Sequence, residues 1–232
     1  MMPKKYAMMM SAVMLAVACG AEPRRERMVR EQIEARGVTN TAVLAAMRKV
    51  PREEFVPMAW RELAYRDGPL PIGRGQTISQ PYVVALMTEL LELKPGEKVL
   101  EVGTGSGYQA AILAEVGAEV YTIEIVETLA KSAAERLKRL GYERVKVTCG
   151  DGYLGWKEHA PFDAVMVTCA VEPVPPPLLE QLKPGGRLVV PLGAAGETQM
   201  LVVLRKDAKG NVTRRDVVPV AFVPLVRESG KE

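Results

Sequence analysis

The sequence predicts an α/β fold with a doubly wound, mostly parallel sheet, helices on both faces and a C-terminal antiparallel hairpin. Three observations predict this fold. From residue 98 onwards, short and nearly continuous apolar runs alternate with helical segments, which is typical of a parallel sheet covered on both faces. A glycine-rich turn follows the first of these runs. The last two apolar runs flank a polar turn at residues 207–211, which predicts a hairpin that closes the sheet.

The composition is that of an ordinary globular protein, and it excludes several kinds of site. Of the 232 residues, 48% are hydrophobic and 25% are charged, so there is enough apolar material for a core. The single histidine excludes a multi-histidine metal site, and the three distant cysteines form no C-x-x-C pair. Residues 1–27 hold five basic and two acidic residues, which account for the whole net charge of +3. The remainder is neutral, which argues against a nucleic-acid partner.

Residues 1–27 are expected to be a signal-like N-terminal extension. Two lysines precede an uncharged, mostly apolar run over residues 6–18, and an A-x-A sequence stands just before Cys19. This pattern is typical of a secretory signal, and the cysteine also suits a lipoprotein signal. The run is shorter than the ~20 apolar residues of a membrane-spanning helix. Two alternatives remain: export or a lipid anchor through residues 1–19, or a body that begins at Met28 and works in the cytoplasm.

Residues 28–232 are expected to form a single domain whose first part, residues 28–97, is largely helical. Pro81 suits the first turn of a helix, because its missing N–H group needs no partner there. The segment over residues 51–75 is rich in proline and glycine and is expected to be irregular. The predicted helices of this part cover residues 28–36, 41–49 and 81–93.

Residues 98–232 are expected to form the sheet, because apolar runs of strand length alternate with helical segments that end at glycines such as Gly117 and Gly141. The predicted strands cover residues 98–102, 119–125, 145–149, 162–168, 187–192, 199–205 and 217–223. The predicted helices cover residues 108–116, 127–140 and 177–182.

The glycine-rich turn reads E-V-G-T-G-S-G over residues 101–107. Glycines here let backbone N–H groups approach a ligand closely, and the start of the next helix adds partial positive charge. Glu124 ends the second strand, where a carboxylate can accept hydrogen bonds from both hydroxyls of a ribose. Tyr108 stands where a dinucleotide fingerprint has its third glycine, which disfavours a nucleotide-dependent oxidoreductase.

Acidic residues lie at the ends of three successive strands: Glu101, Glu124 and Asp151. Such a set repels phosphates and suits a ligand with an amine and a sulfonium, as in S-adenosylmethionine, and Asp151 could accept from an adenine amine. Each acid alone could instead satisfy backbone donors in a loop, but the set favours a cofactor site. The candidate cofactor-binding residues are Glu101, Gly103, Thr104, Gly105, Glu124, Asp151 and Gly152, and no metal site is expected.

Other catalytic chemistries find little support. A Walker phosphate loop and a G-x-S-x-G nucleophile elbow are both absent from the sequence. His159 lies in a polar loop and is expected to be solvated rather than a catalytic base. Cys149 and Cys169 are expected to be small core residues at strand ends rather than nucleophiles.

Six motifs stand out along the chain: G-Q-T-I-S-Q-P (75–81), V-L-E-V-G-T-G-S-G-Y (99–108), G-D-G (150–152), A-P-F-D-A (160–164), Q-L-K-P-G-G-R-L (181–188) and F-V-P-L (222–225). Together they resemble the protein-L-isoaspartate O-methyltransferase family, and the resemblance runs from about Met28 to Val226. The glycine motif is common to most class I methyltransferases, whereas T-I-S-Q-P is much more specific to this family. One departure is Cys169, since the family usually reads Thr-Ala-Ala where this chain has T-C-A.

The resemblance implies a Rossmann-like class I methyltransferase that moves the methyl group of S-adenosylmethionine to the free α-carboxylate of L-isoaspartyl residues in damaged proteins. The methyl ester then collapses to a succinimide, part of which hydrolyses to normal aspartate. A carboxylate is already ionised at neutral pH, so no general base is required. The resemblance makes Ser79 the catalytic residue, although Ser79 could also be a helix N-cap. It further implies substrate contacts from Thr77, Ile78, Gln80 and Val223.

The expected partners are proteins and peptides that contain isoaspartate, and the expected product of the cofactor is S-adenosyl-L-homocysteine. A monomer with no metal, no nucleic acid and no stable membrane span is expected. The main alternative is a class I methyltransferase that acts on a small molecule and does not need residues 76–81. A binding module that does not turn over a peptide is a further alternative.

Overall fold

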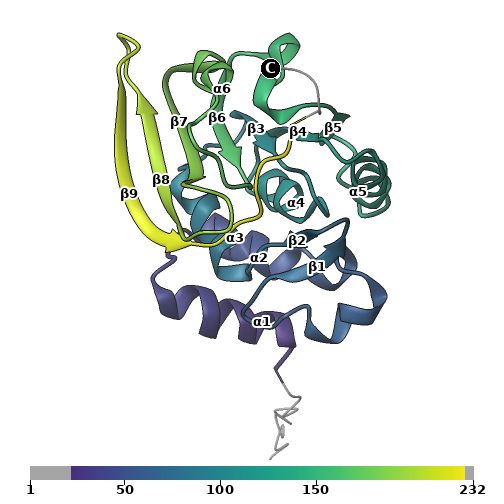
Figure 1. Cartoon of the computed structure of the whole chain (residues 1–232). Coiled ribbons are helices and arrows are strands. Elements are labelled where there is room, and N and C mark those ends of the chain that lie inside the picture. Colours follow the sequence, from purple (N-terminus) through teal and green to yellow (C-terminus); the bar gives the residue numbers. More distant parts are fainter. Residues whose placement is uncertain (1–21, 228–232) are drawn as a thin grey trace, which may run out of the picture.

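The computed structural model describes residues 22–227, so the signal-like run over residues 6–18 and Cys19 lie outside the described residues (Figure 1). Its main sheet has seven strands in the order β5-β4-β3-β6-β7-β8-β9, and β1 pairs with β2 separately. The strands are β1 (Leu70–Gly73), β2 (Gln76–Ile78), β3 (Lys98–Val102), β4 (Glu119–Glu124), β5 (Lys146–Cys149), β6 (Phe162–Val167), β7 (Leu182–Leu192), β8 (Gln199–Lys206) and β9 (Val212–Val220).

The helical elements comprise six α-helices and six short turns of π or 3-10 type within the described residues. The α-helices are α1 (Arg24–Met28), α2 (Thr41–Lys49), α3 (Pro81–Leu90), α4 (Tyr108–Glu115), α5 (Glu127–Arg139) and α6 (Pro176–Glu180). The short turns are η1 (Val29–Ile33), η2 (Glu34–Arg36), η3 (Arg52–Phe55), η4 (Met58–Leu63), η5 (Gly152–Leu154) and η6 (Lys157–His159).

The predicted sheet with a C-terminal antiparallel hairpin is confirmed. Strands β3 to β7 pair in parallel, whereas β7 with β8 and β8 with β9 pair antiparallel. The last strand covers Val212–Val220 rather than residues 217–223. It is an edge strand whose first half is charged and exposed, as is common at the edge of a sheet. Because this half has no apolar pattern, the sequence analysis did not recognise it as a strand.

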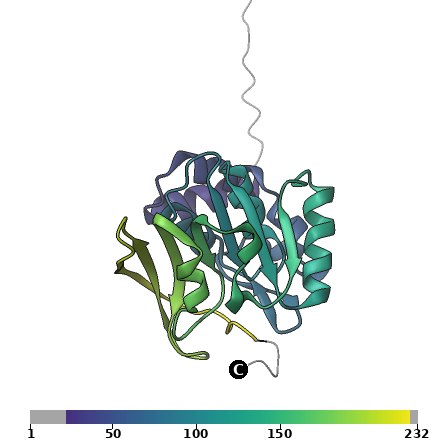
Figure 2. The same ribbon diagram turned by 90° about the horizontal axis from the view of Figure 1, so that it is seen from above.

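Side chains of the central strands alternate between two faces of the sheet. Along β3, Val99 belongs to a core shared with α2, α3 and α4, whereas Leu100 and Val102 belong to a second core with Leu178 of α6. Glu101 therefore shares the face of Val99, because side chains two residues apart point the same way. Figures 1 and 2 show α5 at the edge of the molecule opposite the β8–β9 hairpin.

The first helix begins earlier than the sequence predicts. It starts at Arg24 rather than at Met28, and it continues through a π turn and a 3-10 turn. Arg25 donates hydrogen bonds to the carbonyl oxygens of Arg48 (3.1 Å) and Lys49 (2.9 Å) at the end of α2. The folded part of the chain therefore includes residues before Met28, which is itself buried.

The segment expected to be irregular over residues 51–75 contains two 3-10 turns and strand β1 of a small hairpin. Arg74 and Gly75 form its turn, and both have positive φ angles, of 54° and 71°. Two such residues in succession are the signature of a tight turn that matches the twist of paired strands. The hairpin ends at Ile78, one residue before Ser79.

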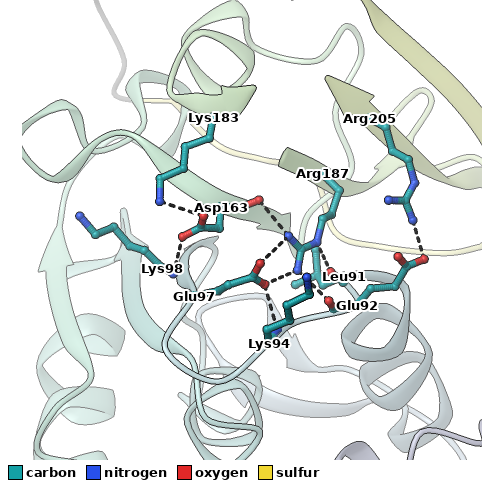
Figure 3. A network of polar contacts seen from close by, with 9 residues as sticks. All are labelled: Leu91, Glu92, Lys94, Glu97, Lys98, Asp163, Lys183, Arg187 and Arg205. Atoms are coloured by element: carbon teal, nitrogen blue, oxygen red, sulfur yellow. Dashed lines mark hydrogen bonds and ion pairs between the residues drawn. The ribbon is translucent and has the colours of Figure 1, made fainter. Parts of the chain in front are cut away.

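A polar network joins the end of α3 to the end of the sheet at which β3 and β6 begin (Figure 3). Arg187 of β7 is nearly buried and donates to Glu97 and to the carbonyl oxygens of Leu91 and Glu92. Burial opposes ionisation of Glu97, but hydrogen bonds from Arg187 and from a backbone amide outweigh it and hold the pKa of Glu97 below its usual value. The ionised Glu97 thus stabilises the fold above a pH of about 4.5.

Replacing Glu97 with glutamine is expected to lower the free energy of unfolding by roughly 1–2 kcal/mol at pH 7, because two charge-assisted bonds from Arg187 weaken. A folded pKa below the unfolded one means that this contribution is lost as the pH falls through the folded pKa. The difference between wild type and variant in urea titrations should therefore shrink below pH 4.5. Glu92→Gln, which breaks the exposed pair with Arg205, should change stability by less than ~1 kcal/mol. Equal losses in the two variants would contradict this account.

Candidate active site

One cavity, which we call the main cavity because it holds most of the predicted site residues, lies where the order of the parallel strands reverses. Strands β4 and β5 lie on one side of β3, and β6 to β9 lie on the other, so a crevice opens at the carboxyl ends of β3 and β6. Ligands of open α/β sheets bind at such a point. Of the predicted site residues, the main cavity is lined by Thr77, Ile78, Ser79, Glu101, Gly103, Thr104, Gly105, Glu124, Gly152 and Val223.

Gly103 follows β3 and packs closely against the residues that follow β6. Its φ of 98° is a conformation that other residues rarely adopt, and a Cβ atom there would meet Thr168 Oγ1 at 2.4 Å and Cys169 Sγ at 2.8 Å. Only glycine therefore fits between β3 and the residues that follow β6. This close packing brings the glycine-rich turn and the end of β6 to the same cavity.

Glu124 holds the glycine-rich turn in place from the end of β4. Its carboxylate accepts hydrogen bonds from the backbone N–H groups of Gly105 (2.8 Å) and Val126 (2.9 Å). Each carboxylate oxygen has room for a second donor, because a carboxylate offers about four acceptor positions. Since Glu124 also lines the main cavity, its free acceptor positions fit the two hydroxyls of a ribose.

Glu101 is fully buried on the face of the sheet that it shares with Thr122 of β4. The Thr122 hydroxyl donates to Glu101 Oε2 at 2.6 Å, while Oε1 has no hydrogen-bond partner among the described residues. Burial, and to a smaller extent the charge of Glu124, raises the pKa of Glu101 to about 8 against the hydrogen bond from Thr122. An unpaired carboxyl oxygen in a cavity wall fits the ammonium group of a ligand.

The stability of the ligand-free protein should depend on pH through Glu101. A folded pKa of about 8 exceeds the unfolded value of 4.5, so the folded state binds an extra proton between these values. The free energy of unfolding is therefore expected to fall as the pH rises from 5 to 8, and Glu101→Gln should remove this component. Urea titrations at several pH values, compared between wild type and variant, measure it. Parallel curves for the two proteins would show that Glu101 is already ionised.

Ser79 lies between β2 and α3 and is partly buried in the wall of the main cavity. The N-cap of α3 is Gln80, not Ser79, and no side chain caps this helix. The expectation that Ser79 could be a helix cap is therefore wrong. Within residues 22–227, the Ser79 hydroxyl makes no hydrogen bond, whereas the Ser79 carbonyl oxygen accepts one from Arg52 at 2.7 Å.

Two predicted site residues, Gln80 and Asp151, lie beside the main cavity rather than in its wall. Gln80 lines a neighbouring groove, together with Tyr82 and Phe222, and its amide donates to Asp67 at 2.7 Å. We call this the side groove; Thr77, Ser79 and Val223 line both it and the main cavity.

Asp151 also departs from its predicted place. One of its oxygens accepts from the backbone N–H of Tyr153 at 2.9 Å and so caps η5. The other has no hydrogen-bond partner among the described residues and lies 3.9 Å from Arg227. Asp151 lines a second hollow, together with Gly150 and Leu154, rather than the main cavity. Local capping and an unpaired oxygen are thus combined in one side chain.

Several cavity residues were missed by the sequence analysis. Tyr108 and Gln109 open α4 directly after the glycine-rich turn, and Thr168 and Cys169 follow the end of β6. Strand order is the signal that would have found the last two, because residues after both strands at a reversal point line the crevice. Burial, and less strongly the charge of Glu124, raises the pKa of the Cys169 thiol to about 12, which agrees with the prediction that Cys169 is not a nucleophile. Cys169 is buried as predicted, but Cys149 is exposed, so the prediction that Cys149 is a core residue is wrong.

The C-terminal segment over residues 221–227, which we call the strap, returns from β9 across the molecule to the main cavity (Figure 1). Ala170 holds it by two backbone hydrogen bonds: its N–H donates to Val223 at 2.8 Å, and its carbonyl oxygen accepts from Leu225 at 2.9 Å. Val223 therefore reaches the cavity as predicted, together with Pro224 and Leu225.

Other candidate sites lie away from this cavity. The His159 ring packs at a tilt against Tyr121 and edge-on against Trp156, with ring centroids 4.4 and 4.8 Å away. It is partly buried rather than fully solvated, and it does not line the main cavity. Over residues 22–227, no three metal-ligating side chains gather into a group that could hold an ion. No helix in the described part of the chain has both the length and the apolar character needed to span a bilayer.

Comparison with known proteins gives one consistent family. The sequence pattern of the protein-L-isoaspartate(D-aspartate) O-methyltransferases matches residues 23–230. A protein-L-isoaspartate O-methyltransferase 1 of Nitrosospira multiformis is 61% identical, covering 88% of this chain and 87% of its own length. A Gloeobacter violaceus protein-L-isoaspartate O-methyltransferase is 57% identical and covers 88% of this chain over its whole length.

Solved structures agree with the sequence comparison. A protein-L-isoaspartate O-methyltransferase superposes with a TM-score of 0.77 at 32% identity, covering 86% of this chain and 65% of that chain. A Plasmodium falciparum beta-aspartate methyltransferase in complex with S-adenosyl-L-homocysteine has a TM-score of 0.75 at 26% identity, covering 89% of this chain and all of that chain. The chain therefore belongs to the protein-L-isoaspartate(D-aspartate) O-methyltransferase family of S-adenosylmethionine-dependent enzymes.

Proposed function

We propose that the chain methylates the free α-carboxylate of L-isoaspartyl residues in the main cavity, with Ser79 as the residue that orients this carboxylate. The observation that carries the proposal is a free serine hydroxyl in the same cavity wall as the glycine-rich turn and two acids. A hydroxyl without a partner in the protein is available to donate to a substrate oxygen. This arrangement serves protein repair, because the methyl ester can return to a succinimide.

The cofactor residues fit S-adenosylmethionine by their chemistry. Glu124 offers free acceptor positions for ribose hydroxyls, the unpaired oxygen of Glu101 suits an ammonium, and Gly103, Thr104 and Gly105 provide a close backbone wall. Gly152 lines the same cavity, whereas Asp151 lines the neighbouring hollow and has one oxygen without a hydrogen-bond partner among the described residues. We assign this oxygen to the adenine amine. When bound, the cofactor supplies a methyl group on a positively charged sulfur.

The work left to the protein is positioning. An ionised carboxylate needs no general base, so the Ser79 hydroxyl has only to hold one of its oxygens in line with the methyl group. Thr77, Ile78 and Val223 form the wall next to Ser79. The side groove, which Gln80 lines, receives the residues of the peptide that flank the isoaspartate. The strap helps to exclude water from the cavity, which strengthens the polar contacts inside it.

A direct assay tests the proposal. Labelled S-adenosylmethionine is incubated with the enzyme and with a pair of peptides that differ only in isoaspartate or aspartate at one position. Label should enter the isoaspartyl peptide as a base-labile ester, and the aspartyl peptide should stay unlabelled. Equal labelling of both peptides would refute the specificity for isoaspartate. Labelling of neither while a small carboxylic acid is methylated would support the small-molecule alternative, which the family match over residues 23–230 does not favour.

The enzyme is proposed to act as a cytoplasmic monomer. The support is chemical, since S-adenosylmethionine is made in the cytoplasm and an exported enzyme would have to find it elsewhere. Cell fractionation with mass spectrometry of the mature N-terminus tests the location, and light scattering tests the oligomeric state. A lipidated N-terminus at Cys19 in the membrane fraction would overturn the location without affecting the chemistry.

A further inference from the structure

Arg52 is an unusual residue in the core of this protein. It lies in η3, and its side chain is fully buried, although it makes no ion pair within the described part of the chain. Burial lowers the pKa of its guanidinium, as expected for a cation that lacks a carboxylate partner. Removing a charge from water is unfavourable unless the protein replaces its lost hydrogen bonds, so the contacts that Arg52 makes instead identify its role.

The guanidinium of Arg52 joins three separate segments. Nε donates to the carbonyl oxygen of Ala64 at 2.8 Å, just after η4, and Nη2 donates to the carbonyl oxygen of Ser79 at 2.7 Å. Its Cζ lies 4.9 Å from the centre of the Tyr108 ring. The third nitrogen, Nη1, has no hydrogen-bond partner among the described residues. The rigid, planar fork of an arginine can make these contacts together, whereas a lysine ammonium cannot.

Two of these three segments line the main cavity, and they carry different parts of the site. Ser79 belongs to the wall assigned to the substrate, and Tyr108 is the first residue of α4 after the glycine-rich turn assigned to the cofactor. Phe55, in the same 3-10 turn as Arg52, packs edge-on against Tyr108 with ring centroids 5.4 Å apart. The turn η3 is thus fixed to the cofactor side through Tyr108 and reaches the substrate side through Arg52.

We infer that Arg52 is a positioning residue for methyl transfer: it holds the main chain at Ser79 against the start of α4, so that the Ser79 hydroxyl keeps its place beside the main cavity. The inference rests on the proposed role of Ser79. The Ser79 carbonyl oxygen belongs to the peptide unit before Gln80, where the hairpin ends and α3 has not yet begun. Neither element's own hydrogen bonds fix this residue, so the bond from Arg52 does so.

Arg52→Lys is the first test, because it keeps the charge and can satisfy only part of the contacts. We expect kcat for an isoaspartyl peptide to fall by about tenfold, since small misplacements of reacting groups lower rates by one to two powers of ten. The affinity for S-adenosyl-L-homocysteine, measured by calorimetry, should change by less than about threefold. If the variant does not fold, as shown by its thermal unfolding, Arg52→Gln removes the buried charge, keeps one donor and is tested in the same way.

A double-mutant cycle with Ser79→Ala distinguishes a positioning role of Arg52 from a general loss of rigidity in the protein. If Arg52 acts through Ser79, the double variant should be no slower than Ser79→Ala alone, because residues that act as one unit are not additive. Losses that multiply, or a loss of kcat matched by an equal loss of cofactor affinity, would overturn the inference. Wild-type kinetics for Ser79→Ala would instead refute the proposed role of Ser79, so the two failures are distinguishable.

Arg25 provides a matched control in the same part of the chain. It is a partly buried arginine that also donates to two backbone carbonyl oxygens, those of Arg48 and Lys49, but neither of these residues lines the main cavity. Arg25→Lys should lower the melting temperature and leave kcat unchanged. A fall in kcat for Arg25→Lys as large as for Arg52→Lys would show that any loosened arginine slows the enzyme, and the inference would be wrong.

Discussion

Replacing Ser79 with alanine is expected to lower kcat/KM for an isoaspartyl peptide by roughly ten- to a hundredfold. The variant removes a hydrogen bond to an ionised carboxylate, a contact that contributes about 1.5–3 kcal/mol. The Ser79 hydroxyl makes no hydrogen bond within the described protein, so its removal should disturb the fold little. Steady-state kinetics with a fixed, saturating concentration of S-adenosylmethionine measure the loss.

The effect of Ser79→Ala should be confined to the substrate. Calorimetry with S-adenosyl-L-homocysteine is expected to give an affinity close to that of the wild type, since the cofactor contacts assigned to Glu101 and Glu124 are untouched. Ser132→Ala, a serine on α5 away from the cavity, is the control and should retain full activity. Wild-type kcat/KM in a folded Ser79→Ala protein would refute the assigned role.

Replacing Glu124 with alanine is expected to weaken the binding of S-adenosyl-L-homocysteine by about a hundredfold. The variant removes the acceptor for the ribose and also leaves the N–H groups of Gly105 and Val126 without their partner. Loss of a charged acceptor contributes up to about 3 kcal/mol, which corresponds to two powers of ten in affinity. Titration calorimetry at pH 7 measures this change directly.

The control for Glu124 lies on the same strand. Glu119 is the first residue of β4 and Glu124 the last, so the two lie at opposite ends of the strand. Glu119 is half exposed, and Glu119→Gln should leave the affinity for S-adenosyl-L-homocysteine unchanged. Glu124→Gln is informative as well, because its amide oxygen can still accept one backbone N–H group, and it should fall between wild type and Glu124→Ala. Unchanged affinity in a folded Glu124→Ala variant would show that the ribose hydroxyls bind elsewhere.

The sheet was predictable because its central strands are buried on both faces. Such strands give continuous apolar runs, and the predicted strand over residues 98–102 coincides with β3. The hairpin β1–β2 was not predictable, because its strands are three or four residues long and lie among prolines and glycines that suggest loops. The start of the first helix at Arg24 was missed because charged residues there carry no apolar pattern.

The candidate site was predictable where a residue lies in or next to a sequence motif. It was not predictable where the role of a residue depends on contacts between distant parts of the chain. Gly103 and Glu124 follow from the glycine motif and from the end of the next strand, and both line the main cavity. Arg52 could not be recognised, because its contacts with Ala64, Ser79 and Tyr108 join positions far apart in the sequence. Asp151 shows that a position at a strand end is not sufficient either, since this residue lines a neighbouring hollow rather than the main cavity.

The strap could make cofactor exchange a local event. Its backbone is tied to Ala170 by two hydrogen bonds and to the Gln199 side chain by a third, from the N–H of Phe222, and each such bond contributes about 1 kcal/mol to stability. A segment held by few contacts is expected to open without unfolding of the sheet behind it. We therefore expect spent cofactor to leave, and fresh cofactor to enter, on the time scale of this local opening. The rate of exchange would then depend on the contacts of the strap and not on the stability of the whole protein.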